Sequence, residues 1–211
     1  CSDAEFIKDA YSTGLIDGVT TNPSLMLKAG KDPREVLKQI SDIFPFHASV
    51  SAEVVGDTVE EMLEMADDYI ELGPNITIKV PLTPEGLKVC KDLSSDDVAV
   101  NVTLCFSTAQ AILAAKAGAT YVSPFVGRVY DQQFDGIQLI EEISDVYATH
   151  KQKTQILAAS IRDVHQVASC FRVGADICTI PDKIFSGMYK HILTDQGLKK
   201  FDEDWSKLVG G

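Results

Sequence analysis

The sequence has few of the features that mark metalloproteins, disulfide-bonded proteins and membrane proteins. No C-x-x-C or H-E-x-x-H pattern occurs among its 211 residues, and no apolar run approaches the roughly 20 residues of a membrane-spanning helix. Its cysteines are odd in number and widely spaced, at Cys1, Cys90, Cys105, Cys170 and Cys178. We therefore expect no metal site, no membrane partner, and free thiols in a reducing cytoplasm.

Positive charge is also scarce in this sequence. Lysine and arginine number 19 against 31 aspartates and glutamates, which gives a formal net charge of −12 at pH 7. Such a balance argues against nucleic acid as the main partner. It remains compatible with a small anionic substrate, because a few local arginines suffice to bind one phosphate group. Length and composition are those of one ordinary globular domain, so we expect a single domain over residues 1–211.

What the sequence does contain is a repeat of strand and helix. Seven short apolar runs have the character of strands, and amphipathic segments such as 57–72 and 107–118 separate them. The runs cover residues 18–22, 48–54, 75–81, 98–104, 121–126, 154–160 and 176–181. This alternation predicts an α/β fold with a parallel sheet. One further strand before Cys1 would complete a (β/α)8 TIM barrel, so we expect a barrel whose first strand is missing from this sequence.

The two ends of the chain are predicted to be helical. The opening stretch reads as a helix that Ser2 or Asp3 can cap and that Gly14 can end. The C-terminal stretch is amphipathic, and we expect a helix at about 195–208.

Polar and apolar residues alternate within the predicted strands. At 75–81, Ile78 and Val80 share one side and Lys79 lies on the other; the same pattern places Leu104 and Val126 on the apolar sides of their strands. The apolar sides should face the helices and the polar sides the barrel interior. Near the carboxyl ends, where barrel enzymes hold their active sites, the inward-facing set is Asn22, Glu53, Lys79, Asn101, Thr103, Ser123 and Ser160. Any one of them alone fits a satisfied core group, but the seven together indicate a site.

A lysine in such a confined place has a specific chemistry. A lysine in a confined, partly apolar site loses its proton more easily, and a neutral amine at Lys79 would attack carbonyl carbons to form a Schiff base. The protonated imine then accepts electrons from a neighbouring carbon–carbon bond, without a metal or cofactor. Glu53 on the adjacent strand can move protons. Asn22, Asn101 and Ser123 can hydrogen-bond the hydroxyl groups of a substrate.

A phosphate site is predicted at the same end of the barrel. Arg128 follows the run at 121–126, and Ser160 and Arg162 follow the run at 154–160. Two guanidinium groups and a hydroxyl group that converge there suit a phosphate. Either arginine alone would more often be a surface charge.

Several stretches resemble the transaldolase family. "GVTTNPSL" (18–25) and "ITIKVPLTPEG" (76–86) resemble its two signatures, and 101–107, 123–131 and 157–162 resemble its further blocks. "FDEDW" (201–205) is similar to the tail of the short subfamily, which also includes fructose-6-phosphate aldolase. The resemblance covers essentially the whole chain in the same order.

The resemblance implies a (β/α)8 barrel in which Lys79 forms the Schiff base and Glu53 and Thr103 hold the catalytic water. It implies the following substrate-binding residues: Thr20, Asn22, Asn101, Ser123 and Phe125. Arg128, Ser160 and Arg162 would bind the phosphate, with Arg162 the weakest assignment because short members vary there.

The resemblance also separates two activities. Fructose-6-phosphate aldolases tend to carry Gln where this chain has Glu53 and Tyr where it has Phe125, so the sequence favours a transaldolase of the pentose phosphate pathway. Such an enzyme transfers a dihydroxyacetone unit from fructose 6-phosphate or sedoheptulose 7-phosphate to an aldose phosphate. The alternatives are an aldolase that releases free dihydroxyacetone and, more remotely, a non-catalytic barrel that binds sugar phosphates.

The N-terminus of this sequence departs from the family pattern. Family members begin with a strand that ends in Leu-Asp-Thr, whose aspartate is the acid/base for carbon–carbon cleavage. Cys1 falls at the threonine of that pattern, so the aspartate would directly precede it and we expect a truncated N-terminus. Short members form decamers of two pentameric rings, clasped by the C-terminal helix around Trp205, and we expect a homo-oligomer here too.

Overall fold

Seven parallel strands form one curled sheet in the computed structural model, which describes residues 2–209. They follow one another in chain order across the sheet: β1 Gly18–Thr20, β2 Ser49–Glu53, β3 Ile76–Pro81, β4 Val100–Cys105, β5 Tyr121–Pro124, β6 Gln155–Ala158 and β7 Ile177–Cys178. Each overlaps a run that the sequence predicts as a strand. This confirms the α/β fold of the TIM-barrel type.

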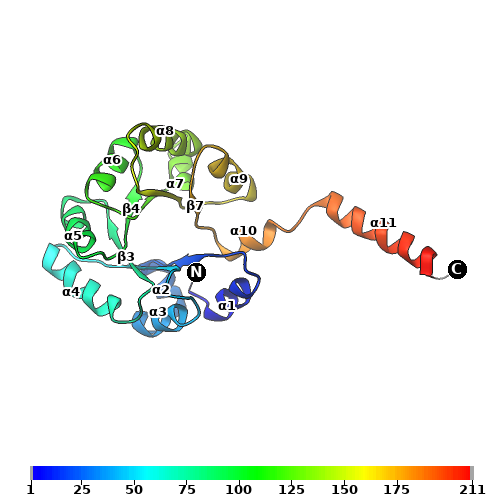
Figure 1. Ribbon diagram of the computed structural model, residues 1–211, viewed down its shortest axis with the longest axis horizontal. Helices are drawn as coiled ribbons and strands as arrows, with labels where there is room; N and C mark the ends of the chain where they lie inside the picture. Colours follow the sequence, from blue (N-terminus) through cyan, green and yellow to red (C-terminus); the bar gives the residue numbers. More distant parts are fainter. Residues whose placement is uncertain (1, 210–211) are drawn as a thin grey trace.

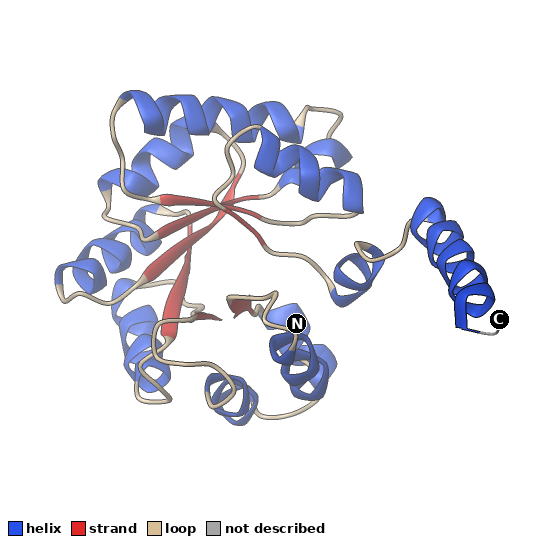
Figure 2. Ribbon diagram, turned by 45° about the vertical axis from the view of Figure 1, so that its right-hand side comes forward, coloured by secondary structure: helices blue, strands red, loops and turns tan. Residues whose placement is uncertain are grey.

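Helices surround the sheet on its outer side (Figure 1). They are α1 Ala4–Ser12, α2 Pro23–Ala29, α3 Pro33–Ser41, α4 Val59–Ile70, α5 Pro84–Ser95, α6 Thr108–Lys116, α7 Val126–Asp131, α8 Gly136–Thr149, α9 Val164–Arg172 and α10 Asp182–Gly187, and the chain continues into α11 Ile192–Val209, which lies outside this ring. Figure 2 shows the strands crossing inside this ring of helices. Within residues 2–209, no helix combines the length and the hydropathy of a membrane-spanning segment.

Local sequence explains where these helices begin. Asp3, one of the two expected caps of α1, accepts hydrogen bonds from the N–H groups of Glu5 and Phe6. Thr58 and Glu61 form a reciprocal capping box at α4, in which each side chain accepts from the other residue's N–H at 3.2 Å. A cap of this kind stabilises a helix by about 1 kcal/mol.

The core lies between the sheet and the helices. Val50, Ile78, Val80 and Val102 are completely buried from the strands, and Met62 of α4 is equally buried on the helix side. Burial of this apolar surface, worth about 25 cal/mol per Å², is the main force that holds the helices on the sheet. The predicted apolar side of each strand is therefore the side that forms the core.

The alternation fails at two positions. Leu104 has a φ of +60° and is only partly buried, and the β4–β5 register shifts between Val102 and Cys105. The prediction that Leu104 continues the apolar side is wrong because this left-handed residue interrupts the extended backbone. The run at 121–126 is also shorter as a strand, since β5 ends at Pro124 and Val126 begins α7.

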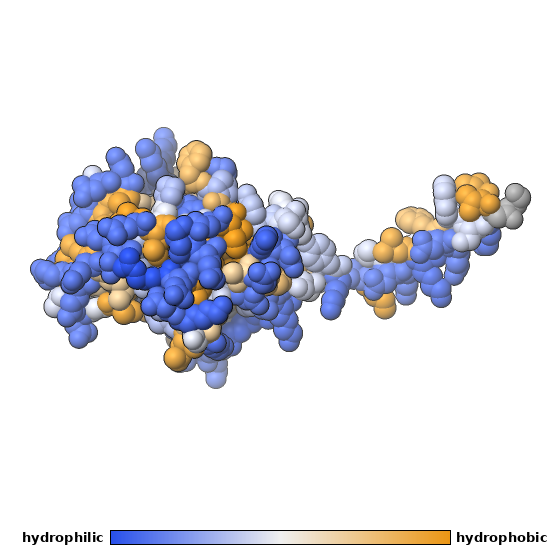
Figure 3. Space-filling model, turned by 90° about the horizontal axis from the view of Figure 1, so that it is seen from below, coloured by the Kyte–Doolittle hydropathy of each residue, from blue (hydrophilic) through white to orange (hydrophobic). Residues whose placement is uncertain are grey.

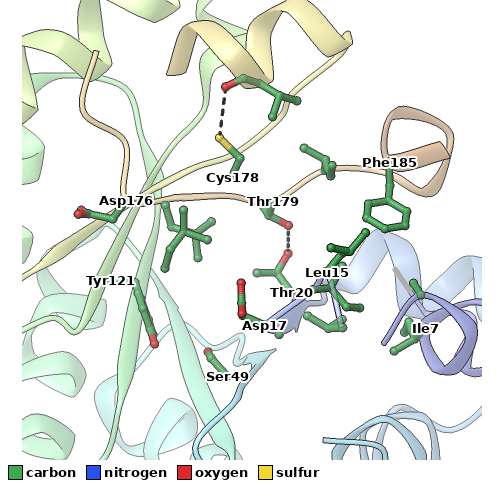
Figure 4. A pocket seen from close by; sticks show the side chains of 18 of the residues that line it. Ile7, Leu15, Asp17, Thr20, Ser49, Tyr121, Asp176, Cys178, Thr179 and Phe185 are labelled. Carbon is green, nitrogen blue, oxygen red and sulfur yellow. Dashed lines mark hydrogen bonds between the residues drawn. The ribbon is translucent and has the colours of Figure 1, made fainter. Parts of the chain in front are cut away.

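The sheet has two edges in the described part of the chain, and they face each other. β1 and β7 are the edge strands, and a cavity of about 480 Å³ lies between them, with Thr20, Ser49, Tyr121 and Cys178 on its wall (Figure 4). The Thr20 and Thr179 hydroxyl oxygens, 2.7 Å apart, bridge the two edges. An eighth strand would fit in this opening; none is formed there by the described residues, and it stays a prediction.

The C-terminal helix α11 stands apart from the barrel. It covers the helix expected at 195–208 and projects away from the ring of helices (Figure 1). No residue of α11 is buried, and Phe201, Trp205 and Leu208 are all strongly exposed. Figure 3 shows apolar side chains along this projecting segment.

The opening between β1 and β7 predicts how an added strand changes stability. We expect a segment of alternating apolar and polar residues, fused ahead of Cys1, to raise Tm by roughly 5 °C or more, because it would pair with both edges and bury apolar wall. The control is a Gly/Ser segment of equal length. Differential scanning calorimetry compares the two, and equal Tm values would contradict an eighth strand at this place.

Candidate active site

Strand register places the predicted catalytic residues in one row. Glu53 of β2 pairs with Lys79 of β3, and Lys79 pairs with Asn101 of β4. Because the strands are parallel, these three residues lie at the same height near the carboxyl end of the sheet. Thr103 follows two residues later on β4, opposite Pro81, on the same inward-facing side.

Lys79 is buried and donates two hydrogen bonds. Only 5% of it is exposed, and its Nζ atom donates hydrogen bonds to Glu53 Oε2 at 2.8 Å and to the Thr21 carbonyl oxygen at 3.2 Å. A buried ammonium group is tolerated only with such partners. The Glu53 carboxylate is thus within direct proton-transfer distance of the amine. Sequence reasoning missed Thr21, since a backbone carbonyl gives no signal in the side-chain pattern.

Asn101 is held by hydroxyl groups on both sides. The Ser123 hydroxyl donates to Asn101 Oδ1 at 2.7 Å, and Asn101 Nδ2 donates to the Ser51 hydroxyl at 3.3 Å. All three side chains are buried, so this chain of hydrogen bonds fixes the orientation of the amide. Ser51 was not among the predicted residues, although it precedes Glu53 by two and therefore shares its inward face.

Thr103 carries a buried hydroxyl group without a partner. Its Oγ1 atom is inaccessible to solvent and makes no hydrogen bond to any described residue. Leaving such a group unsatisfied costs about 1–3 kcal/mol, and it calls for an explanation in each native structure. Thr103 stands two residues beyond Asn101 on the same inward-facing side of β4, so its unpaired hydroxyl belongs to the same end of the sheet as Lys79.

Thr20 and Asn22 have structural partners at the end of β1. Asn22 Oδ1 accepts a hydrogen bond from the Leu25 N–H at 2.9 Å and so caps α2, and the Thr20 hydroxyl contacts that of Thr179. The cap leaves the amide N–H groups of Asn22 as the donors that it can offer a ligand. Asn22 and Glu53 line a cavity of about 410 Å³ at the carboxyl end of the sheet.

The predicted phosphate residues are brought together in part. The Gly127 N–H donates to the Ser160 carbonyl oxygen at 3.1 Å, which packs α7 against the loop after β6. A Cβ atom on Gly127 would lie 2.1 Å from that oxygen, so only glycine permits the approach. Arg128, the next residue, places its guanidinium group 4.9 Å from the centre of the Phe125 ring. Arg128 and Ser160 therefore belong to one rim.

Arg162 is engaged elsewhere on this rim. Its guanidinium forms a two-pronged ion pair with the Asp131 carboxylate, at 2.9 and 2.5 Å. Among the described residues Arg128 makes no ion pair, so it is the arginine more available to an anion. Asp131 stands in the stretch 123–131, but its partner could not be read from the sequence because the two residues are 31 positions apart.

The thiol closest to this row in sequence is unsuited to act as a nucleophile. Burial raises the pKa of Cys105 to about 12, so at neutral pH it remains a thiol, which is a poor nucleophile. Within residues 2–209, no three histidine, cysteine or acidic side chains gather as metal ligands. The arrangement as a whole is a buried amine with a carboxylate beside it, fixed amide and hydroxyl groups, and a cationic rim.

Comparison with known proteins identifies relatives along the whole chain. A sequence model of the family described as Transaldolase/Fructose-6-phosphate aldolase matches residues 1–211. A protein of Paracoccus denitrificans named "Probable transaldolase" is 51% identical over 98% of this chain and 94% of its own length. A protein of the same name from Caulobacter vibrioides is 48% identical over 97% of this chain and 94% of its own length.

A solved structure shares the fold alone. The crystal structure of inosine 5'-monophosphate dehydrogenase from Legionella pneumophila superposes with a TM-score of 0.54 at 16% sequence identity. The match covers 72% of this chain and 49% of that one. At this identity the likeness supports the barrel architecture and nothing about the reaction.

The unpaired hydroxyl of Thr103 predicts an unusual stability result. We expect Thr103→Val to leave the free energy of unfolding unchanged or to raise it by about 1 kcal/mol, because an unsatisfied group is removed. The matched control is Thr77→Val on β3, whose buried hydroxyl lies 2.8 Å from the Ser49 hydroxyl; this variant should lose about 1 kcal/mol. Urea denaturation measures both, and equal losses would show that the Thr103 hydroxyl serves the fold.

Proposed function

Because the chain belongs to the transaldolase/fructose-6-phosphate aldolase family, we propose that it is a transaldolase. It takes a dihydroxyacetone unit from fructose 6-phosphate or sedoheptulose 7-phosphate and passes it to an aldose phosphate. The observation that supports this most strongly is Lys79, a buried lysine at the carboxyl end of a barrel strand whose Nζ atom lies 2.8 Å from Glu53. No cofactor takes part in the scheme.

The first half of the reaction forms the Schiff base. Glu53 accepts a proton from Lys79, and the neutral amine attacks the C2 carbonyl of the ketose phosphate. The C2 oxygen then leaves as water, with its protons supplied through Glu53 and a water molecule held by Glu53 and Thr103. The unpaired Thr103 hydroxyl supports this role, because it is buried on the inward side of the neighbouring strand.

The second half cleaves and remakes a carbon–carbon bond. The protonated imine takes up the electron pair of the C3–C4 bond, the aldose phosphate leaves as an aldehyde, and an enamine remains on Lys79. The proton of the C4 hydroxyl goes to a base, which the family resemblance assigns to the aspartate expected before Cys1. The enamine then adds to the aldehyde carbon of the acceptor, and hydrolysis of the imine frees the lysine.

The remaining predicted residues bind the substrate. Asn101 and Ser123, already fixed by hydrogen bonds, hold the hydroxyl groups of the dihydroxyacetone unit together with the Asn22 amide. Arg128 and Ser160 bind the phosphate from the rim. Arg162 contributes only if phosphate competes with the Asp131 carboxylate for its guanidinium.

The second candidate is an aldolase that releases free dihydroxyacetone. Release requires protonation of the enamine carbon, and a tyrosine hydroxyl could assist that step. This chain has Phe125 at the corresponding place, and Phe125 carries no proton donor. The resemblance adds a separate reason, since aldolases of the family tend to carry Gln where this chain has Glu53.

The two candidates predict different dependence on an acceptor. We expect release of glyceraldehyde 3-phosphate from fructose 6-phosphate only when erythrose 4-phosphate is present, because the enamine must be passed on. A coupled NADH assay follows this release. Lys79→Met should abolish it, whereas Lys116→Met, which changes an exposed lysine on α6, should not. Continuous release without an acceptor would identify an aldolase instead.

We also propose that the protein is a cytoplasmic homo-oligomer, with a decamer of two pentameric rings as the expected form. The 18-residue helix α11 has no buried residue, and its exposed apolar side chains gain free energy only against another surface.

The oligomer proposal predicts the effect of changes on α11. Phe201→Ser combined with Trp205→Ser should convert the oligomer to a smaller species, because the two largest exposed aromatic side chains of this helix are removed. Lys199→Ser combined with Glu203→Ser, on the same helix, is the control and should keep the oligomer. Analytical ultracentrifugation measures the mass, and a wild-type monomer would contradict the proposal.

A further inference from the structure

Phe106 is a large apolar side chain at the rim of a polar site. It directly follows β4 and is 41% exposed. β4 carries Asn101 and Thr103, so Phe106 stands at the same end of the sheet as the row that contains Lys79. A single exposed phenylalanine needs no explanation by itself. Phe106, however, is held in place by its backbone hydrogen bond to Gln110 and by ring contact with Phe125.

The backbone that leads to Phe106 is strained. Leu104 adopts a φ of +60°, which is unusual for a bulky residue, and the β4–β5 register shifts at this point. Irregularities of this kind re-aim side chains next to active sites. Beyond it, the Phe106 N–H donates to Gln110 Oε1 at 2.8 Å, and Ser107 caps α6. The position of Phe106 is therefore fixed from both sides.

Phe106 packs on Phe125, the residue whose ring contacts Arg128. Its ring packs on Phe125 at a centroid distance of 5.7 Å in an edge-to-face geometry, with 62° between the ring planes. Phe125 in turn carries the Arg128 guanidinium 4.9 Å from its ring centre. Edge-to-face pairs and cation–π contacts are both attractive. Phe106, Phe125 and Arg128 thus form a stack along the rim, from β4 to α7.

This stack is what orients Arg128. Arg162 is fixed by its ion pair with the Asp131 carboxylate. Arg128 forms no ion pair with any described residue, and its guanidinium group instead makes a cation–π contact with the Phe125 ring. Arginine has a long, flexible side chain, and fixing it before a ligand arrives lowers the entropy lost on binding. Phe125 can fix Arg128 only while its own ring is held, and Phe106 packs against that ring.

We infer that Phe106 is a positioning residue for phosphate: it holds the Phe125 ring, and through that ring it pre-orients Arg128 toward the phosphate of the substrate. The inference rests on the proposed function, because it takes Arg128 as the phosphate-binding arginine. Phe106 itself does not touch the reacting atoms.

The test measures phosphate binding without turnover. Isothermal titration calorimetry with inorganic phosphate should give a Kd about two- to fivefold higher for Phe106→Ala than for the wild type. Phe106→Tyr keeps the ring and should restore the wild-type Kd. The matched control is Phe46→Ala, an exposed phenylalanine that packs on His47 ahead of β2, which should leave the Kd unchanged. Tm values of all variants establish that they fold.

A double variant separates positioning from general damage. In an Arg128→Met background, Phe106→Ala should add no further loss of phosphate affinity, because the arginine that it orients is gone. In turnover assays with fructose 6-phosphate, Phe106→Ala should raise KM more than it lowers kcat. The same variant should change KM less with unphosphorylated fructose.

The outcomes distinguish this inference from the proposed function. Equal phosphate affinity in wild type and Phe106→Ala, with acceptor-dependent turnover intact, overturns the inference alone. A weaker affinity that depends on Arg128, in a protein without transaldolase activity, supports the inference and overturns the function. An unmodified protein that binds neither phosphate nor fructose 6-phosphate overturns the inference together with the phosphate site.

Discussion

The parallel register of β2, β3 and β4 is the constraint on which the site depends. It sets Glu53 beside Lys79 and Lys79 beside Asn101, so a buried ammonium group meets its counter-charge at 2.8 Å. A shift of one residue would turn Lys79 toward the apolar helices and leave the carboxylate without a partner. Removing one member of a buried ion pair costs about 3–5 kcal/mol, so register and ion pair support each other. The environment of the lysine, on which its proposed chemistry rests, therefore follows from how the strands pair.

Three features that cost free energy lie at the carboxyl end of the sheet. Leu104 and Ser160 both adopt a φ of +60° there, and the Thr103 hydroxyl is buried without a partner in the described chain. Each such feature costs on the order of 1–3 kcal/mol. Other left-handed residues follow the C-caps of α5, α7 and α8. The helices also have side-chain caps such as Asp3 and the Thr58 box, and they cover a buried apolar core. The cost of the features at the carboxyl end is tolerated because the helix caps and the apolar core agree with the sequence.

Much of the fold was readable from the sequence, because strand alternation has a strict period of two. The seven strands and the row of Glu53, Lys79 and Asn101 follow from that period and from parallel pairing. What could not be read are contacts without a local pattern. The Thr21 carbonyl that holds Lys79 is backbone, and the Arg162–Asp131 pair joins the loop after β6 to the end of α7, 31 residues apart in sequence. The left-handed conformation of Leu104, which directs the chain toward Phe106, could not be predicted either, because leucine has no preference for positive φ.

The central claim is that Lys79 is the residue that becomes covalently attached to the substrate. Borohydride reduction in the presence of fructose 6-phosphate, followed by proteolysis and mass spectrometry, tests it directly, since reduction makes an imine permanent. We expect one modified lysine, Lys79, which carries the reduced sugar or its three-carbon fragment. We expect no modification when fructose 6-phosphate is left out. A substrate-dependent adduct on a different lysine, or none at all in a folded protein that binds the sugar phosphate, would contradict it.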